Sequence, residues 1–426
     1  MKLTQIFIHI CLVFTLISCD STVTIDTTLP SLTDVYISGA CLNQEDDTIE
    51  LSVSLINKAS EDSRSVLIPS DQIAKETKSV GELVTPSTFT LTRPANATDL
   101  QMGFTENGFT QGDDQTFSDI TLNTQSVDFE FVADDEKLEQ KTLVIFLLDQ
   151  SGSHIGETLL PDGNTEFRPE EASDLNDNRF TLIRQVIRNM PSNYFVSLID
   201  FKKDASNKAI DDPDSVVEPL PNNSGNQSKI EEYLRKLGRS EQKTGGTPLK
   251  QALVDTLDLI DLVKKNSPST KVVVVLYTDG TEAGDTSISD KANAYASLEE
   301  LGYEFADLKV PLHVIHLQPN ILVKDSSWRG PKEELASLAC LTTGDYFFVP
   351  RDQELTKKEI EPHLISRMIG RWKLSLQAQR VFSSELSAGQ GYFLSTDVQA
   401  ELGGEVHGYE IANQSTKDRR LWFHKY

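Results

Sequence analysis

Cysteine is scarce in this sequence, with 4 among 426 residues. Cys11 and Cys19 lie near the N-terminus, so Cys41 and Cys340 are the two that remain in the body of the chain. No pair has the short spacing of zinc-binding cysteines, which excludes a cysteine-based metal site. Cys41 and Cys340 fall in different predicted domains. We therefore expect buried free thiols, although an exported chain permits a disulfide.

Basic residues are also few: 40 Lys and Arg stand against 65 Asp and Glu, which gives a net charge of -25. Such a chain repels phosphate backbones, so nucleic-acid binding is excluded. The hydrophobic fraction of 38% and charged fraction of 25% are those of ordinary globular proteins. The length predicts two or three domains.

Catalytic motifs are missing as well. The 7 histidines include no His-Glu-x-x-His arrangement, and His313 and His316, three apart in a predicted strand, point to opposite faces. His154 follows Ser153, but we expect it at the surface because the sequence offers it no partner. We therefore predict that the protein is not an enzyme.

Motifs for a nucleophilic serine and for nucleotide binding are incomplete. Ser151 occupies the position of the first glycine in a Gly-x-Ser-x-Gly elbow around Ser153. Gln242 replaces the glycine that a phosphate-binding loop would need after Gly238. These departures argue against hydrolase activity and against a bound nucleotide.

Long hydrophobic runs are absent beyond the N-terminus. Lys2 precedes an apolar run from Ile6 to Ile17, which predicts a signal peptide over residues 1–18. Its end, Leu16-Ile17-Ser18-Cys19, resembles the lipobox of bacterial lipoproteins, which implies that Cys19 carries lipid such as palmitate. The protein is then expected in the bacterial cell envelope, held on a membrane, periplasmic or surface-exposed. The alternative is an ordinary secretory signal with a chance cysteine.

The segment after a linker at 19–30 has strand periodicity. Ile49 to Ile56 alternates apolar and polar residues, and similar runs occur at 87–92, 120–122 and 127–132. Residues 31–139 therefore predict an antiparallel β-sandwich. Strands expected at 391–394, 397–402 and 406–410 assign residues 373–426 to the same sandwich, with an α/β domain inserted, or to a separate small β unit.

Residues 140–372 differ in texture, because continuous apolar runs alternate with segments of helical period. The runs predict strands buried on both faces at 143–148, 194–201, 271–277, 311–317 and 346–349. Helices are predicted at 178–190, 227–237, 248–265, 290–308, 331–341 and 354–371. This alternation predicts a doubly wound, mainly parallel sheet covered by helices.

Hydroxyl and carboxylate side chains follow two of the predicted strands and precede one helix. Asp149-Gln150-Ser151-Gly152-Ser153 ends the first buried strand, and Thr278-Asp279-Gly280 ends the third. Gly245-Gly246-Thr247-Pro248-Leu249 leads into a helix. Singly, these are a turn motif and a helix cap.

Together, in this order, the three segments resemble the metal-ion-dependent adhesion site of von Willebrand factor A and integrin I domains. The resemblance implies five ligands of one divalent cation: Asp149, Ser151, Ser153, Thr247 and Asp279. Mg²⁺ is the expected ion, with Mn²⁺ and Ca²⁺ as alternatives, because such hard cations take oxygen ligands. Two carboxylates leave the ion under-neutralised, so a partner protein's Asp or Glu is expected to complete its coordination.

This resemblance and the lipobox together imply a membrane-anchored adhesion protein that binds its ligand through the cation. The alternative is an envelope-assembly or stress-related scaffold that uses the same domain without metal. Two insertions depart from the family pattern. Residues 155–177 predict a flap at the site, and the acidic insertion at 203–224, with Asp211-Asp212-Pro213-Asp214, predicts a solvated loop in preference to an accessory cation site.

Overall fold

The computed structural model describes most of an α/β domain and, as backbone only, the strands of a β-sheet region. The described residues of the α/β domain are 141–159, 165–190, 193–202, 216–238, 246–280, 289–317, 332–349 and 364. The backbone strands lie between 34 and 133 and between 370 and 425. The predicted signal peptide, Cys19 and the linker lie outside the described residues.

The centre of the α/β domain is a six-stranded sheet with the order β15-β14-β11-β16-β17-β18. The strands are β11 (Thr142–Asp149), β14 (Tyr194–Phe201), β15 (Val216–Pro221), β16 (Lys271–Thr278), β17 (Leu312–Leu317) and β18 (Tyr346–Val349). All neighbours are parallel except the edge strand β15, which is antiparallel to β14. The predicted mainly parallel, doubly wound fold is therefore confirmed.

Counted in chain order, these strands run 3-2-1-4-5-6 across the sheet. The winding direction reverses between β11 and β16, and ligands of open α/β sheets bind at this switch point, outside the carboxyl ends of the strands. Every residue of β11 is buried, because helices cover both faces of the sheet there. This burial explains why the apolar runs are continuous.

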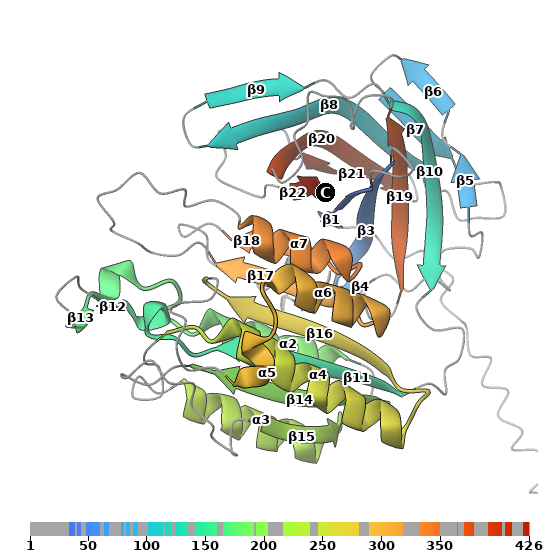
Figure 1. Ribbon diagram of the computed structural model, residues 1–426. Helices are drawn as coiled ribbons and strands as arrows, with labels where there is room; N and C mark the ends of the chain where they lie inside the picture. The colour runs from blue at the N-terminus through green and yellow to red at the C-terminus, as the bar shows by residue number, and fades with distance from the viewer. Residues whose placement is uncertain are drawn as a thin grey trace, which may run out of the picture. The chain divides into compact units, whose positions relative to one another are not determined.

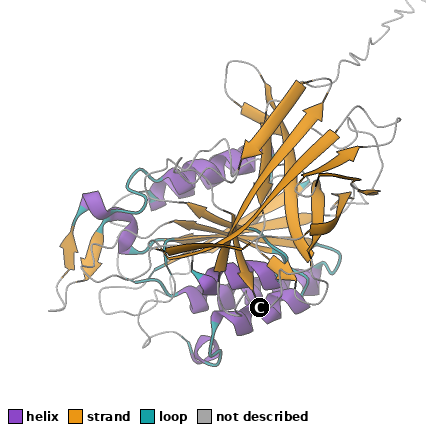
Figure 2. Ribbon diagram, turned by 90° about the horizontal axis from the view of Figure 1, so that it is seen from above, coloured by secondary structure: helices purple, strands orange, loops and turns teal. Residues whose placement is uncertain are grey.

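Helices cover the two faces in separate groups, seen on either side of the sheet in Figure 2. One face packs against α2 (Asn178–Asn189) and α3 (Ser224–Leu237). The other packs against α4 (Leu249–Asn266), α5 (Asp290–Asn293), α6 (Leu298–Asp307) and α7 (Glu333–Leu341). Successive side chains of β11 pack alternately into the hydrophobic cores on the two faces of the sheet, with Leu143 in one core and Val144 in the other. The course of the chain through these layers is shown in Figure 1.

Two predicted helices differ from the observed ones. The helix expected over 290–308 is divided into α5 and α6, because the Ser297 hydroxyl accepts the N–H of Glu300 and starts a new helix. The helix expected over 354–371 lies mostly outside the described residues. Its last two residues, Gly370 and Arg371, belong instead to strand β19 (Gly370–Ala378).

The strands from both flanks of the α/β domain form one hydrogen-bonded sheet of 14 strands. In it β19 lies between β10 (Thr124–Ala133) and β3 (Thr48–Ala59), and β20 (Gly391–Leu402) pairs with β8 (Gln101–Asp113). The others are β1 (Asp34–Ser38), β2 (Cys41–Asn43), β4 (Arg64–Leu67), β5 (Lys78–Val80), β6 (Glu82–Thr85), β7 (Thr88–Thr92), β9 (Thr116–Ile120), β21 (Glu405–Glu410) and β22 (Leu421–Lys425). The predicted sandwich packing depends on side chains that lie outside the described residues.

The expectation of a free thiol at Cys340 is wrong, because this buried residue of α7 is disulfide-bonded. Its partner lies outside the described residues. We expected free thiols because the two cysteines fall in different predicted domains. Residues of different domains can still lie close enough in space to form a disulfide.

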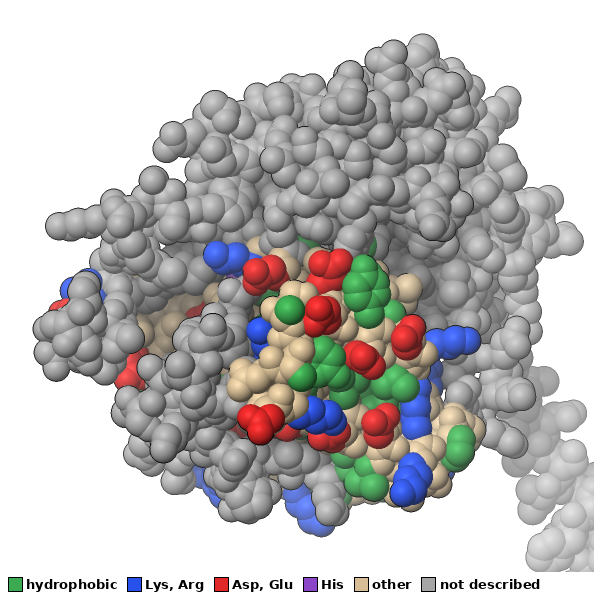
Figure 3. Space-filling model, in the orientation of Figure 1, with side chains coloured by type: hydrophobic (Ala, Val, Ile, Leu, Met, Phe, Trp, Pro, Cys, Tyr) green, Lys and Arg blue, Asp and Glu red, His purple; other side chains and the backbone are tan. Residues whose placement is uncertain are grey.

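The surface formed by α4, α5 and α6 carries acidic and basic side chains interspersed with hydrophobic ones (Figure 3). Leu262 and Tyr303 are half exposed there, and Lys291 pairs with Asp258. Among the described residues, no helix has the length and apolar character needed to cross a bilayer.

Candidate functional site

The candidate site lies where β11 and β16 end side by side. Asp149 is the last residue of β11, and Asp279 directly follows β16. Because the two strands are parallel neighbours, their carboxyl ends meet at one edge of the sheet. This edge is the switch point of the winding, so the fold brings the two predicted carboxylates to its natural ligand crevice.

Asp149 is fully buried and accepts hydrogen bonds from Ser151 and Thr278. The N–H of Ser151 donates to its Oδ1 at 2.8 Å, and the Thr278 hydroxyl donates to its Oδ2 at 2.7 Å. A carboxylate has about four lone-pair sites, so acceptor capacity remains after these hydrogen bonds. The carboxylate is thus oriented by the protein and still able to bind a cation.

A chain of hydroxyl groups connects the two strand ends. Ser151 Oγ lies 3.0 Å from Ser153 Oγ, and Ser153 donates to Asp279 Oδ1 at 3.0 Å. Either hydroxyl can be the donor between the two serines, and the Ser151 side chain also forms a hydrogen bond with Asp149. The structure therefore brings four of the five predicted ligands together: Asp149, Ser151, Ser153 and Asp279.

Thr247, the fifth predicted ligand, lies in the segment before α4. It is 5% exposed, and its carbonyl accepts the N–H of Leu249 at 3.0 Å. Within the described part of the chain, no hydrogen bond joins its side chain to the other four. Gly245, from the same motif, lies outside the described residues.

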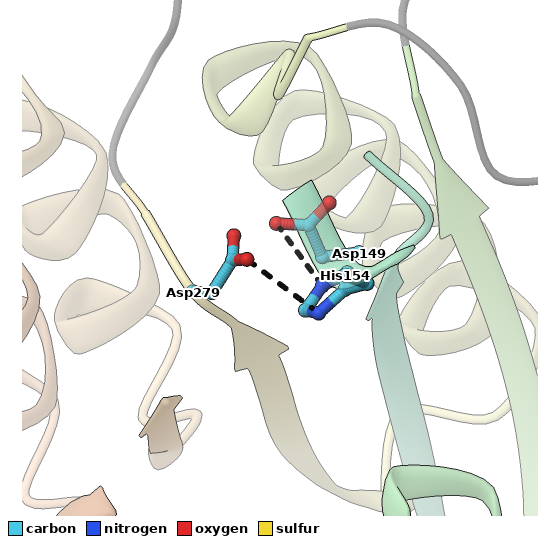
Figure 4. A group of neighbouring side chains, drawn as sticks. All are labelled: Asp149, His154 and Asp279. Carbon is cyan, nitrogen blue, oxygen red and sulfur yellow. Dashed lines mark ion pairs between the residues drawn. The ribbon is translucent and has the colours of Figure 1, made fainter. Parts of the chain in front are cut away.

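His154 is buried, so its expected surface position is wrong. It lies in the short 3₁₀ helix η1 (Gly152–Ile155), which turns its ring between the two carboxylates (Figure 4). Its Nε2 is 3.8 Å from Asp149 Oδ2, and its Nδ1 is 3.6 Å from Asp279 Oδ2. The sequence did not show these partners, because Asp279 comes from a distant segment and only the turn of η1 brings the ring back to Asp149.

The insertion after Ser153 contributes to the site. Gly156 ends η1 with φ 85°, a conformation that favours glycine, and its carbonyl accepts the Arg168 N–H at 2.8 Å. Strands β12 (Glu157–Leu159) and β13 (Thr165–Phe167) form a hairpin, followed by the 3₁₀ helix η2 (Pro169–Glu171). We call residues 155–177 the flap; their described residues leave the site and return to it.

Ser173, on the returning part of the flap, is a site residue that sequence reasoning missed. Its hydroxyl donates to Asp279 Oδ2 and lies 2.9 Å from His154 Nδ1. The neighbouring backbone fixes this position, because the Ser173 N–H donates to the Ser153 carbonyl at 3.2 Å. The only signal in the sequence was the unusual length of the insertion, which does not say which serine returns.

A buried ion pair lies beside the flap. Arg179, fully buried at the start of α2, donates from Nη1 to Asp174 Oδ2 at 2.7 Å, and its Nη2 is 3.5 Å from Gln150 Oε1. Asp174 also accepts the N–H of Asn178 at 2.7 Å, and its own N–H donates to the His154 carbonyl at 3.3 Å. The pair therefore anchors the base of the flap to η1 and α2.

Burial disfavours ionisation of the two site carboxylates, and for Asp149 the charge of its neighbour adds to this effect. Loss of solvation, and then the charge of Asp279, raise the pKa of Asp149 from 3.8 to about 7. Burial also raises the pKa of Asp279, against the donors Ser173 and Ser153. Two buried acids that cost free energy to ionise are stabilised by a cation between them.

The other strand histidines have separate roles. The N–H of Asp345 donates to His313 Nδ1 at 3.0 Å, and His316 Nδ1 is 2.7 Å from the Tyr346 hydroxyl. Burial lowers the pKa of His316 to about 3, so this ring is neutral. Both are structural residues of β17.

The side chains at the strand ends fit a divalent cation. Carboxylate and hydroxyl oxygens are the donors that Mg²⁺ and Mn²⁺ take, and one imidazole adds a nitrogen donor. Asp149, His154 and Asp279 each offer one ligand atom, and these three atoms lie within 4.8 Å of one another. The acidic tetrapeptide Asp211-Asp212-Pro213-Asp214 lies outside the described residues, although the end of that insertion forms β15.

No protein-family model matches this sequence, and no curated protein matches it. The chain is similar to the solved structure of a von Willebrand factor type A protein from Catenulispora acidiphila, with 12% identity, a TM-score of 0.36, and coverage of 78% of this chain and 75% of that one. It is also similar to the pilus adhesin SpaC from Lactobacillus rhamnosus GG, with 11% identity and a TM-score of 0.35, covering 77% of this chain and 48% of that one. The minor pilin PilB from Streptococcus sanguinis is similar at 13% identity and a TM-score of 0.34, with coverage of 80% and 90%.

Proposed function

We propose that the α/β domain binds a protein partner through a divalent cation held at the ends of β11 and β16. The observation that carries this proposal is the pair of buried carboxylates, Asp149 and Asp279, joined by the hydroxyls of Ser151 and Ser153. A buried charge is stable only when it is paired or coordinates a metal. In this proposal, Thr247 supplies a further oxygen from the segment before α4.

The charge of the site determines which kind of partner group the cation would bind. Two aspartates balance the formal charge of a divalent ion, but a coordination position that the protein leaves open still binds an anionic oxygen in preference to a neutral one. Asp and Glu are the side chains that supply one. An acidic group of a partner protein is therefore the proposed ligand, and no step of bond making or breaking is required.

Ser173 and His154 lie within hydrogen-bond distance, yet their arrangement does not favour nucleophilic catalysis. A nucleophilic serine gives its proton to the histidine. With Asp279 ionised, the one proton of Ser173 goes to that carboxylate, so Ser173 accepts a hydrogen bond from His154. Absence of enzyme activity stays a prediction.

Titration of the metal-free mature chain with Mg²⁺ and Mn²⁺ tests the cation site. We expect saturable binding and a higher melting temperature, because a ligand that binds only the folded state stabilises it. Asp149→Asn should abolish both effects. Asp261→Asn is the matched control, because it removes an equal charge from an exposed position. Asp261 lies about 18 Å along α4 from Leu249, the first residue of the helix, at a rise of 1.5 Å per residue.

Capture from a cell-envelope extract tests the partner. A protein retained by the parent in Mg²⁺, and lost with EDTA or with Asp149→Asn, should then be produced with its exposed Asp and Glu changed to Asn and Gln. Loss of binding by one such change supports the proposal. Equal capture by parent, Asp149→Asn and EDTA-treated protein would favour the alternative, a scaffold that acts without metal.

We further propose that the protein is lipid-anchored in the bacterial envelope through Cys19. The support is the sequence Leu16-Ile17-Ser18-Cys19 after an apolar run. An acidic body would be repelled by anionic headgroups, so attachment would depend on the lipid. Cys19→Ala should leave the protein unprocessed or soluble; fractionation with membranes, unchanged from the parent, would contradict the anchor.

A further inference from the structure

The position of one proton determines which nitrogen of His154 can bind a metal. Ser173 has a single hydroxyl proton, and with Asp279 ionised it goes to Asp279 Oδ2. Ser173 Oγ must then accept the hydrogen bond from His154 Nδ1, 2.9 Å away. Nδ1 therefore donates, and in the tautomer that can bind a metal Nε2 carries the lone pair.

That lone pair faces a carboxylate oxygen. His154 Nε2 lies 3.8 Å from Asp149 Oδ2, and both residues are fully buried. Two acceptors that face each other repel, whereas a cation between them binds both. Two ligands at bond lengths of about 2.0–2.2 Å lie at most about 4.4 Å apart, so this separation is within reach of one shared ion.

We propose that Nε2 of His154 is a protein ligand of the cation, and that the site therefore selects a divalent transition metal over Mg²⁺. The proposal rests on the cation site proposed above and names the ion that it takes. Imidazole binds Zn²⁺ well and Mn²⁺ less well, whereas Mg²⁺ prefers oxygen alone. We expect affinity in the order Zn²⁺, Mn²⁺, Mg²⁺.

The surroundings of His154 are those of a metal-binding histidine. Such residues donate their second ring N–H to an acceptor that fixes the tautomer and the orientation of the ring. Here Ser173 is that acceptor, and it links the ring to Asp279. Because Ser173 comes from the flap, the flap acts as the outer support of the nitrogen ligand.

Pulsed electron paramagnetic resonance of the mature chain loaded with Mn²⁺ tests the nitrogen ligand without any substitution. We expect coupling of the Mn²⁺ electron spin to an imidazole nitrogen-14 nucleus. Loss of this coupling in His154→Asn would assign it to His154. Bound Mn²⁺ without nitrogen coupling would overturn the proposal.

Two substitutions of His154 test the role of its Nε2. His154→Asn keeps an N–H near Ser173 and removes Nε2, so affinity for Zn²⁺ and Mn²⁺ should fall at least about tenfold, with little change for Mg²⁺. His154→Gln places an amide oxygen near Nε2, so the ratio of Zn²⁺ to Mg²⁺ affinity should fall. Circular dichroism identifies variants that fail to fold. If a variant does not fold, the resonance experiment on the parent protein tests whether His154 is a ligand.

The outcomes distinguish this inference from the proposed function. Absence of any cation binding by the parent would overturn both. Cation binding that needs Asp149 but is unaffected by His154→Asn would overturn this inference alone. Tighter binding of Zn²⁺ by His154→Asn would also overturn it, because His154 would then compete with the cation.

Discussion

The hydroxyl of Thr278 lies 2.7 Å from Oδ2 of Asp149, so the last residue of β16 orients the carboxylate at the end of β11. The next residue, Asp279, supplies the second carboxylate. Thr278 thereby couples the two strand ends, and it also accepts the Gly280 N–H at 3.2 Å, which shapes the turn.

We expect Thr278→Val to lower the free energy of unfolding by about 1–3 kcal/mol, because it leaves a buried carboxylate oxygen without its donor. It should also weaken cation binding. Thr278→Ser retains the hydroxyl and serves as the control. Urea denaturation measures the change; equal stabilities of the valine and serine variants would contradict the orienting role.

The raised pKa of Asp149 predicts how pH affects the metal-free protein. Between 3.8 and about 7 the folded state holds a proton that the unfolded state releases, so stability from this group is lost as pH rises through that range. Asp279, whose pKa is also raised, acts with the same sign.

Melting temperatures between pH 5 and 8 measure this effect as the difference between parent and Asp149→Asn. The parent should lose more stability than the variant as pH rises. Saturating Mn²⁺ should reduce the parent's loss, because the cation replaces the proton. Parallel pH curves for both metal-free proteins would contradict the raised pKa.

Two arginines of α2 give a matched comparison of buried and exposed ion pairs. Arg179→Met leaves buried Asp174 without its partner and should destabilise the domain by about 3–5 kcal/mol. Arg188→Met breaks the exposed pair with Glu231 and should cost about 0–1 kcal/mol. Urea denaturation of both variants decides; similar losses would show that Arg179 does not anchor the base of the flap.

The disulfide of Cys340 predicts that the stability of the protein depends on oxidation of this cysteine. Cys41 is the expected partner, because Cys11 and Cys19 belong to the predicted signal peptide and lipid site. Cys340→Ser should lower the free energy of unfolding by about 2–5 kcal/mol. Peptide mapping of the non-reduced mature chain should recover Cys41 linked to Cys340, and recovery of both as free thiols would contradict the bridge.

The sequence by itself determined the layers of the α/β domain and part of the site. Strands buried on both faces need continuous apolar residues, so β11, β14 and β16 were evident within about one residue of their observed ends. Asp149, Ser151 and Ser153 lie close together in the chain, so one turn suffices to bring their side chains to the same place. Helices with a clear apolar face, such as α2, were equally evident.

Only the tertiary structure decided the rest, because the decisive contacts join distant residues. Ser153 meets Asp279 across 126 positions, and Ser173 meets Asp279 across 106. His154 was predicted at the surface because the sequence does not show that η1 turns the ring back toward Asp149 or that the end of β16 brings Asp279 beside it. Periodicity reports which face of an element is buried; it does not report which buried side chains meet there.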